Sequence, residues 1–293
     1  MKTEKGKSSF VKLVECPRDA MQGWSSFIPT EKKIAYLNAL MQVGFDTLDF
    51  GSFVSAKAIP QMADTKLVID KISSGGSQTK LLAIVANTRG AAEAAAYSPI
   101  QDLGYPFSIS ETFQKRNTNA SIATSLMTVQ DMLEICRQKG KRLVVYISMA
   151  FGNPYGDPWT PEIALGWIRK LVLMGVQVIS LADTVGLATG EQVYSLTKIL
   201  VEEFPGIESG VHLHSRRENS LEKLDAAFSA GCRRFDGALM GIGGCPMAGD
   251  ELVGNMDSLV MVDYFKKKNV LTVLNEAALN KSTAMASEIF LNH

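Results

Sequence analysis

The strongest constraint on this chain is a short apolar run followed by a longer helix-like segment, a pattern repeated eight times. The apolar runs are mostly continuous, which is typical of strands buried on both faces of a parallel sheet. Eight such units in about 260 residues favour a closed barrel over a doubly wound open sheet, which is the alternative. The predicted strands are residues 10–16, 45–50, 80–86, 105–109, 142–149, 176–181, 209–214 and 234–238.

Capping residues mark several of the predicted helices, such as Asn87 and the Thr160-Pro161 pair. The helices are predicted at residues 30–43, 64–74, 87–96, 121–139, 160–174, 189–204, 217–230 and 252–268, with one more at 275–289. We therefore predict an α/β protein. A (β/α)8 TIM barrel occupies residues 1–268, and a C-terminal helical extension, residues 269–293, packs on it.

Charge and hydropathy argue against two classes of partner. Lys plus Arg and Asp plus Glu both number 30, so no net charge favours nucleic acid or a membrane surface. No apolar run approaches the roughly 18 residues of a membrane helix. Residues 1–10 are polar and lysine-rich with no apolar run after them, unlike a signal peptide. We expect a cytoplasmic protein with reduced, unpaired cysteines.

Two of the three histidines, His212 and His214, lie two residues apart at the end of a predicted strand and so face the same side. Asp19 follows the first strand and Asn255 follows the eighth. Because strands seven, eight and one are neighbours in a closed barrel, these four side chains converge at its C-terminal mouth. Oxygen and imidazole ligands suit Mg²⁺ or Mn²⁺ better than zinc. On spacing alone, a metal site and a structural histidine pair both remain open.

Arg18, beside Asp19, is placed to stabilise negative charge near such a metal, although an ordinary ion pair or a helix cap is the simpler interpretation. The glycines of residues 241–244 make either a tight connection or a phosphate-binding loop, but they lack the spacing of the known phosphate motifs. The residues alone thus indicate a barrel enzyme that depends on a metal.

Six segments, in order between residues 11 and 262, resemble those of the 3-hydroxy-3-methylglutaryl-CoA lyase family of the DRE-TIM metallolyases. They are R-D-A-M-Q at 18–22, S-F-V-S at 52–55 with P-Q-M at 60–62, S-L-A-D-T-V-G at 180–186, V-H-L-H at 211–214, G-I-G-G-C-P at 241–246 and G-N at 254–255. In that resemblance, the cysteine-bearing loop separates the lyases from related synthases and aldolases.

The resemblance implies a barrel that cleaves 3-hydroxy-3-methylglutaryl-CoA to acetyl-CoA and acetoacetate, as in leucine degradation, and that assembles as a dimer or tetramer. It implies a divalent metal, Mg²⁺ or Mn²⁺, on Asp19, His212, His214 and Asn255. It also implies that Arg18 stabilises the enolate and that Cys245 is the catalytic thiol.

Three residues remain candidates for the general base, which are Asp19, Asp49 and Asp183. The acyl-CoA substrate is expected to contact Arg18 as well, and the remaining candidates for the pocket are Gln22, Ser110, Tyr146, Ser148 and Thr184.

The chain also departs from the family pattern at positions expected near the substrate. Asp49 replaces a glutamate, Ser215 and Arg216 replace Asp-Thr, Trp24 stands in a segment that is usually Asn-Glu-Lys, and Leu259 lies where the family has an acidic stretch. Four hypotheses follow: a lyase for 3-hydroxy-3-methylglutaryl-CoA, a lyase or aldolase for another 3-hydroxyacyl-CoA or hydroxy acid, a condensing synthase that uses acetyl-CoA, and a non-catalytic metal- or CoA-binding barrel.

Overall fold

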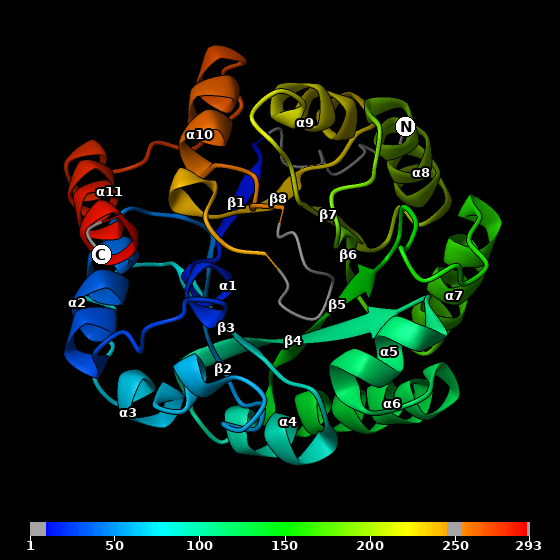
Figure 1. Cartoon of the computed structure of the whole chain (residues 1–293), viewed down its shortest axis with the longest axis horizontal. Helices are drawn as coiled ribbons and strands as arrows, with labels where there is room; N and C mark the ends of the chain where they lie inside the picture. The colour runs from blue at the N-terminus through cyan, green and yellow to red at the C-terminus, as the bar shows by residue number, and fades with distance from the viewer. Residues whose placement is uncertain (1–9, 245–252, 292–293) are drawn as a thin grey trace, which may run out of the picture.

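The computed structural model describes residues 10–244 and 253–291. Eight parallel strands close into a barrel in chain order, and β8 pairs with β1 to complete it (Figure 1). This confirms the predicted closed barrel and excludes the open doubly wound sheet. The strands are β1 Lys12–Glu15, β2 Thr47–Ser52, β3 Lys80–Ile84, β4 Ile100–Ser108, β5 Arg142–Ser148, β6 Val178–Asp183, β7 Glu208–Leu213 and β8 Arg234–Gly237.

Helices surround the barrel (Figure 1). They are α1 Pro17–Gln22, α2 Thr30–Met41, α3 Thr65–Ile69, α4 Thr88–Ala95, α5 Glu111–Thr118, α6 Ile122–Lys139, α7 Pro161–Leu173, α8 Gly190–Glu203, α9 Ser220–Ser229, α10 Ser258–Lys267 and α11 Glu276–Phe290, with 3-10 turns η1 Pro60–Met62 and η2 Leu239–Gly241. Helices α1 and α5 were not predicted from the sequence, because their buried positions include polar residues, Arg18 and Asp19 in α1 and Gln114 in α5, and so show no apolar repeat.

The predicted caps form where side-chain oxygens accept from the first free backbone N–H groups. Asn87 accepts from Gly90, and Thr160 accepts from Ile163. The predicted start of the helix after β8, at residue 252, lies outside the described residues. In the described part, α10 begins at Ser258 and is capped by Asp257.

The C-terminal helix α11 lies beside α2 on the outside of the barrel (Figure 1). Its Phe290 ring meets Trp24 edge-on at a centroid distance of 5.3 Å and Tyr36 at 6.5 Å. Trp24 belongs to the loop between α1 and α2, so the last helix supports a segment at the mouth of the barrel. Within residues 10–244 and 253–291, no helix combines the length and apolarity needed to cross a membrane.

Candidate active site

The structure brings Asp19, His212 and His214 together at the C-terminal mouth of the barrel. One ligand-type atom from each lies within 4.8 Å of the others. Asn255 joins them, because its Nδ2 donates to Asp19 Oδ2 at 2.7 Å and its backbone bridges to His214. His212 lies near the end of β7, and the other three residues follow β1, β7 and β8; closure of the barrel makes β8 and β1 neighbours.

The short helix α1, directly after β1, carries Arg18 and Asp19, which are buried, and Gln22, which is half-buried. Arg18 Nη1 donates to Asp19 Oδ1 at 3.0 Å and to Gln22 Oε1 at 2.8 Å, while Gln22 Nε2 donates to Asp19 Oδ1 at 2.7 Å. Burial alone raises the pKa of Asp19, but Arg18, the two histidines and Asn255 outweigh burial and lower it to about 2. Asp19 is therefore an anion at neutral pH.

Asp49, on β2, holds the other side of the Arg18 guanidinium. Arg18 Nε and Nη2 donate to its carboxylate at 3.0 and 2.5 Å. Burial raises the pKa of Asp49 to about 6, and the pairing with Arg18 opposes this rise. Planar two-point pairing of this kind fixes the guanidinium plane, so Asp49 orients Arg18 toward the cavity.

Each histidine is oriented through its Nδ1 atom. His214 Nδ1 lies 2.9 Å from the carbonyl of Val253, and His212 Nδ1 lies 3.4 Å from Asp236 Oδ2. Such partners leave Nε2 for a metal and set the ring plane. The hydrogen bonds of the Asn255 amide to residues in the described part of the chain both use Nδ2, which leaves Oδ1 to face a ligand. One carboxylate, two imidazoles and an amide oxygen fit a divalent cation of the Mg²⁺ or Mn²⁺ class.

Gly243 packs directly on this group. Its φ is +117°, and a Cβ there would overlap Asn255 Nδ2 and lie 3.0 Å from the carbonyl oxygen of Asp19. Only glycine combines that backbone conformation with so close an approach. The glycine loop is thus a tight connection that covers Asp19 and Asn255.

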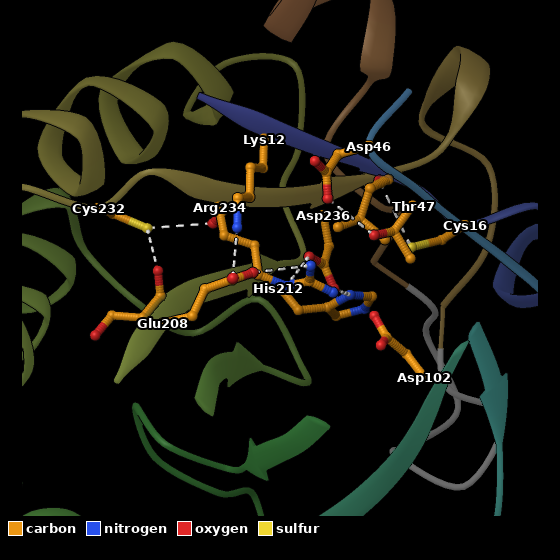
Figure 2. Close-up of polar contacts among 12 residues, drawn as sticks. Lys12, Cys16, Asp46, Thr47, Asp102, Glu208, His212, Cys232, Arg234 and Asp236 are labelled. Carbon is orange, nitrogen blue, oxygen red and sulfur yellow. Dashed lines mark hydrogen bonds and ion pairs between the residues drawn. The ribbon is translucent and has the colours of Figure 1, made fainter. Parts of the chain in front are cut away.

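A network of charged side chains extends from His212 inside the barrel (Figure 2). Asp236 faces His212 on one side, and its Oδ1 lies 3.9 Å from Arg234 Nε. Arg234 is fully buried and reaches Glu208 at 3.4 Å, and Glu208 in turn pairs with Lys12 at 2.5 Å. The network therefore connects a candidate metal ligand to the N-terminal end of the barrel.

Gly210 on β7 makes room for this network, because a Cβ at that position would lie 2.9 Å from Arg234 Cδ. No role was predicted from the sequence for Asp236 or Arg234. The available signal was two charged residues at alternate positions of a short buried strand, the same spacing that marked the histidines.

A cavity of about 440 Å³ opens beside the candidate metal ligands. Arg18, Asp19, His212 and His214 line it, and so do four of the residues predicted to contact the substrate, which are Gln22, Tyr146, Ser148 and Thr184.

Among the described residues predicted as general base or substrate contacts, three do not line this cavity. Asp49 lies behind Arg18. Asp183 accepts from Lys223 at 2.7 Å and from the backbone of Ala188. Ser110 caps α5 and donates to Asp157 at 2.5 Å, which is a structural role. Their own partners hold all three away from the substrate space.

Cys245 lies outside the described residues.

Comparison with known proteins gives the family. The HMGL-like family model matches residues 11–285. The 3-hydroxy-3-isohexenylglutaryl-CoA/hydroxy-methylglutaryl-CoA lyase of Pseudomonas aeruginosa is 35% identical over 81% of this chain and 79% of its own length. The (R)-citramalyl-CoA lyase of Chloroflexus aurantiacus is 30% identical over 90% and 85%.

A solved HMG-CoA lyase from Acinetobacter baumannii, in complex with coenzyme A and 3-methylmalate, superposes with a TM-score of 0.88 at 27% identity and covers 98% of this chain and 93% of its own. With the family model matched along nearly the whole barrel, this chain belongs to the HMGL-like family and is a carbon–carbon lyase.

Proposed function

We propose that this protein cleaves 3-hydroxy-3-methylglutaryl-CoA, or an ester of the same type, to acetyl-CoA and acetoacetate or the corresponding 3-oxo acid. The observation that supports this most is the convergence of Asp19, His212 and His214 with Arg18 on one cavity. Relatives at 30–35% identity are named as lyases for different acyl groups, so family membership leaves the acyl substituent open.

We propose that Asp19, His212, His214 and Asn255 hold a divalent cation, Mg²⁺ or Mn²⁺. When bound, the cation supplies Lewis acidity that makes the tertiary hydroxyl of the substrate easier to deprotonate. The protein holds Asp19 as an anion and sets both imidazole planes before any ligand arrives. The site is therefore organised in advance, which is what electrostatic stabilisation of a reaction requires.

Arg18 is placed to stabilise the thioester enolate that forms when the carbon–carbon bond breaks. Its bonds to the described residues use the Nε hydrogen, both Nη1 hydrogens and one Nη2 hydrogen. One hydrogen of Nη2 is left for a substrate oxygen. Asp49 keeps the guanidinium in that position, and its placement behind Arg18 suits orientation rather than proton transfer. The enolate then takes a proton, for which we propose the Cys245 thiol.

The remaining elements of the proposal concern the protein in the cell. We propose a cytoplasmic homodimer or homotetramer that acts on acyl-CoA, with leucine degradation as the pathway of the methyl ester. A relative named as a cytoplasmic 3-hydroxy-3-methylglutaryl-CoA lyase, from Rattus norvegicus, supports this location at 32% identity. Light scattering during gel filtration tests the assembly.

The test is release of acetoacetate from 3-hydroxy-3-methylglutaryl-CoA with Mg²⁺ or Mn²⁺, with and without a chelator. Cys245→Ala is the test variant, and Cys136→Ala, a buried cysteine on α6, is its matched control. We expect turnover that is lost with the chelator and with Cys245→Ala and is kept by Cys136→Ala. Consumption of acetyl-CoA with a 2-oxo acid, without cleavage, would instead indicate a condensing synthase.

A further inference from the structure

The cavity has two unlike sides. His212 lies on β7 and His214 directly follows it, whereas the segments after α1 and after β2 line another side of the cavity. Between residues 24 and 60, every side chain that these segments add to the cavity lining is apolar except Ser25. We call this side the apolar wall, and it comprises Trp24, Phe27, Val54, Ala58, Ile59 and Pro60.

The apolar wall is held together by a buried glutamine. Gln61 is 4% exposed and lies in η1, directly after the second segment. Its Nε2 donates to the carbonyls of Trp24 and Ser26, and its Oε1 accepts from the backbone N–H of Ile28 at 3.1 Å. One side chain therefore fixes the backbone of the first segment against the second.

Further contacts place the two aromatic rings of the wall. Lys33 bonds to the carbonyl of Gln61 and to Asp64 at 2.8 Å, and its ammonium lies 4.1 Å from the centre of the Phe27 ring. Phe290 supports Trp24 from behind. Phe27 remains 53% exposed although it is held in this way, and it lines the cavity together with the other apolar residues of the wall. A contiguous apolar surface, unlike a single exposed side chain, is typical of a binding site.

Charge separates the two sides as well. Among the described residues that line the cavity, Arg18 is the only one with a permanent positive charge, and Asp49, Asp19 and Gln22 already engage it. Residues 245–252 include no lysine or arginine. An anionic group placed against the apolar wall would lose its hydration without a compensating partner, whereas an alkyl group would gain from burial there.

We infer that the apolar wall receives an alkyl substituent of the acyl group that is longer than methyl. The preferred substrates are then 3-hydroxy-3-alkylglutaryl-CoA esters whose 3-alkyl chain has several carbons. The residues that would hold the cation serve the hydroxyl, Arg18 serves the thioester, and the wall selects the substituent. This inference rests on the proposed lyase function.

The experiment compares kcat/KM for the 3-methyl, 3-butyl and 3-(4-methylpent-3-enyl) esters on the metal-loaded enzyme. Each buried methylene is expected to raise kcat/KM about fourfold, so the butyl ester should exceed the methyl ester by about fiftyfold. Equal or faster cleavage of the methyl ester would overturn the inference and leave the lyase function intact. If no ester is cleaved by folded, metal-loaded protein, both fail.

Variants of the wall test whether these residues are responsible. Phe27→Ser and Ile59→Ser should each lower the butyl-to-methyl ratio at least threefold, and the double variant at least tenfold. Leu173→Ser, at a residue 87% exposed on α7 and outside the cavity, is the control and should keep the ratio. The ratio is measured on one preparation, so partial unfolding cancels. An unchanged ratio in the double variant would mean that the wall contacts another part of the ester, and it would overturn the inference.

Discussion

Glu15 offers a sharp test of the physical reasoning, because it is a fully buried carboxyl group on β1. Its carboxyl accepts from the backbone N–H of Leu239 at 2.8 Å and from the hydroxyl of Ser258. Burial raises its pKa from 4.5 to about 8, although both hydrogen bonds oppose the rise. Glu15 thus joins β1 to η2 and to the start of α10, on either side of residues 245–252.

The raised pKa makes stability depend on pH with a definite sign. Between pH 4.5 and pH 8 the folded protein binds this proton more tightly than the unfolded chain does, so the free energy of unfolding falls as pH rises. At about 1.4 kcal/mol for each pKa unit, the full cost at alkaline pH is on the order of 5 kcal/mol. Between pH 5.5 and pH 8, the free energy of unfolding should fall by about 3 kcal/mol through this group.

Glu15→Gln removes this proton equilibrium while keeping an oxygen for the Leu239 N–H. We expect the variant to become more stable relative to the parent as pH rises, by about 3 kcal/mol between pH 5.5 and pH 8. Urea unfolding followed by circular dichroism at several pH values in this window measures the difference. Comparing the variant with the parent cancels the contributions of the other titrating groups.

Glu288→Gln, at an exposed position on α11, serves as the control and should show no such trend. If the difference between Glu15→Gln and the parent stays constant across the window, Glu15 is ionised in the folded protein at neutral pH. The claim that burial dominates its hydrogen bonds would then be wrong.

Three further substitutions test the site. Asp236→Asn should weaken Mn²⁺ binding by about 10–100-fold, because the amide orients His212 less well than the carboxylate does. Calorimetric titration measures the affinity, and an unchanged value would refute this role of Asp236. Arg18→Met should lower kcat by about 10²–10³-fold with metal affinity reduced much less, and comparable losses in both would point to collapse of the Asp19 site. Gln61→Ala should lower the free energy of unfolding by about 1–3 kcal/mol, since it leaves the backbone groups at Trp24 and Ile28 without their partner; a smaller change in urea unfolding would mean that the loop is held by other contacts.

Local sequence patterns were sufficient for the architecture of the barrel. Continuous apolar runs and helix caps depend on residues close together in the chain. They are therefore visible in the sequence of any protein that buries a parallel sheet on both faces. The caps at Asn87 and Thr160 formed as predicted. The helices α1 and α5 were missed because polar side chains occupy part of their buried faces, so no apolar repeat marks them.

The candidate site was likewise predicted in part from the sequence. Two histidines at alternate strand positions, with Asp19 and Asn255 after neighbouring strands, were sufficient to predict that four side chains meet at one mouth. The sequence did not distinguish the carboxylates that line the cavity from those behind it. Asp49 lies within β2 and Asp183 ends β6, close to the same mouth as Asp19, and only their partners, Arg18 and Lys223, show that they lie behind the cavity wall.

The sequence by itself determined the eightfold alternation, the closed parallel barrel and the residues at its C-terminal mouth, because strand polarity and side-chain periodicity are local properties of the chain. Only the tertiary structure decided that Asp236 orients His212 and that Gln61 joins two segments into the apolar wall. It also decided that Glu15, the last residue of β1, is buried against the start of α10. Each of these depends on contacts between residues far apart in the chain, whose energies come from burial and exact side-chain placement. A linear pattern does not encode which distant partner a polar residue meets, so these roles appear only once the barrel has closed.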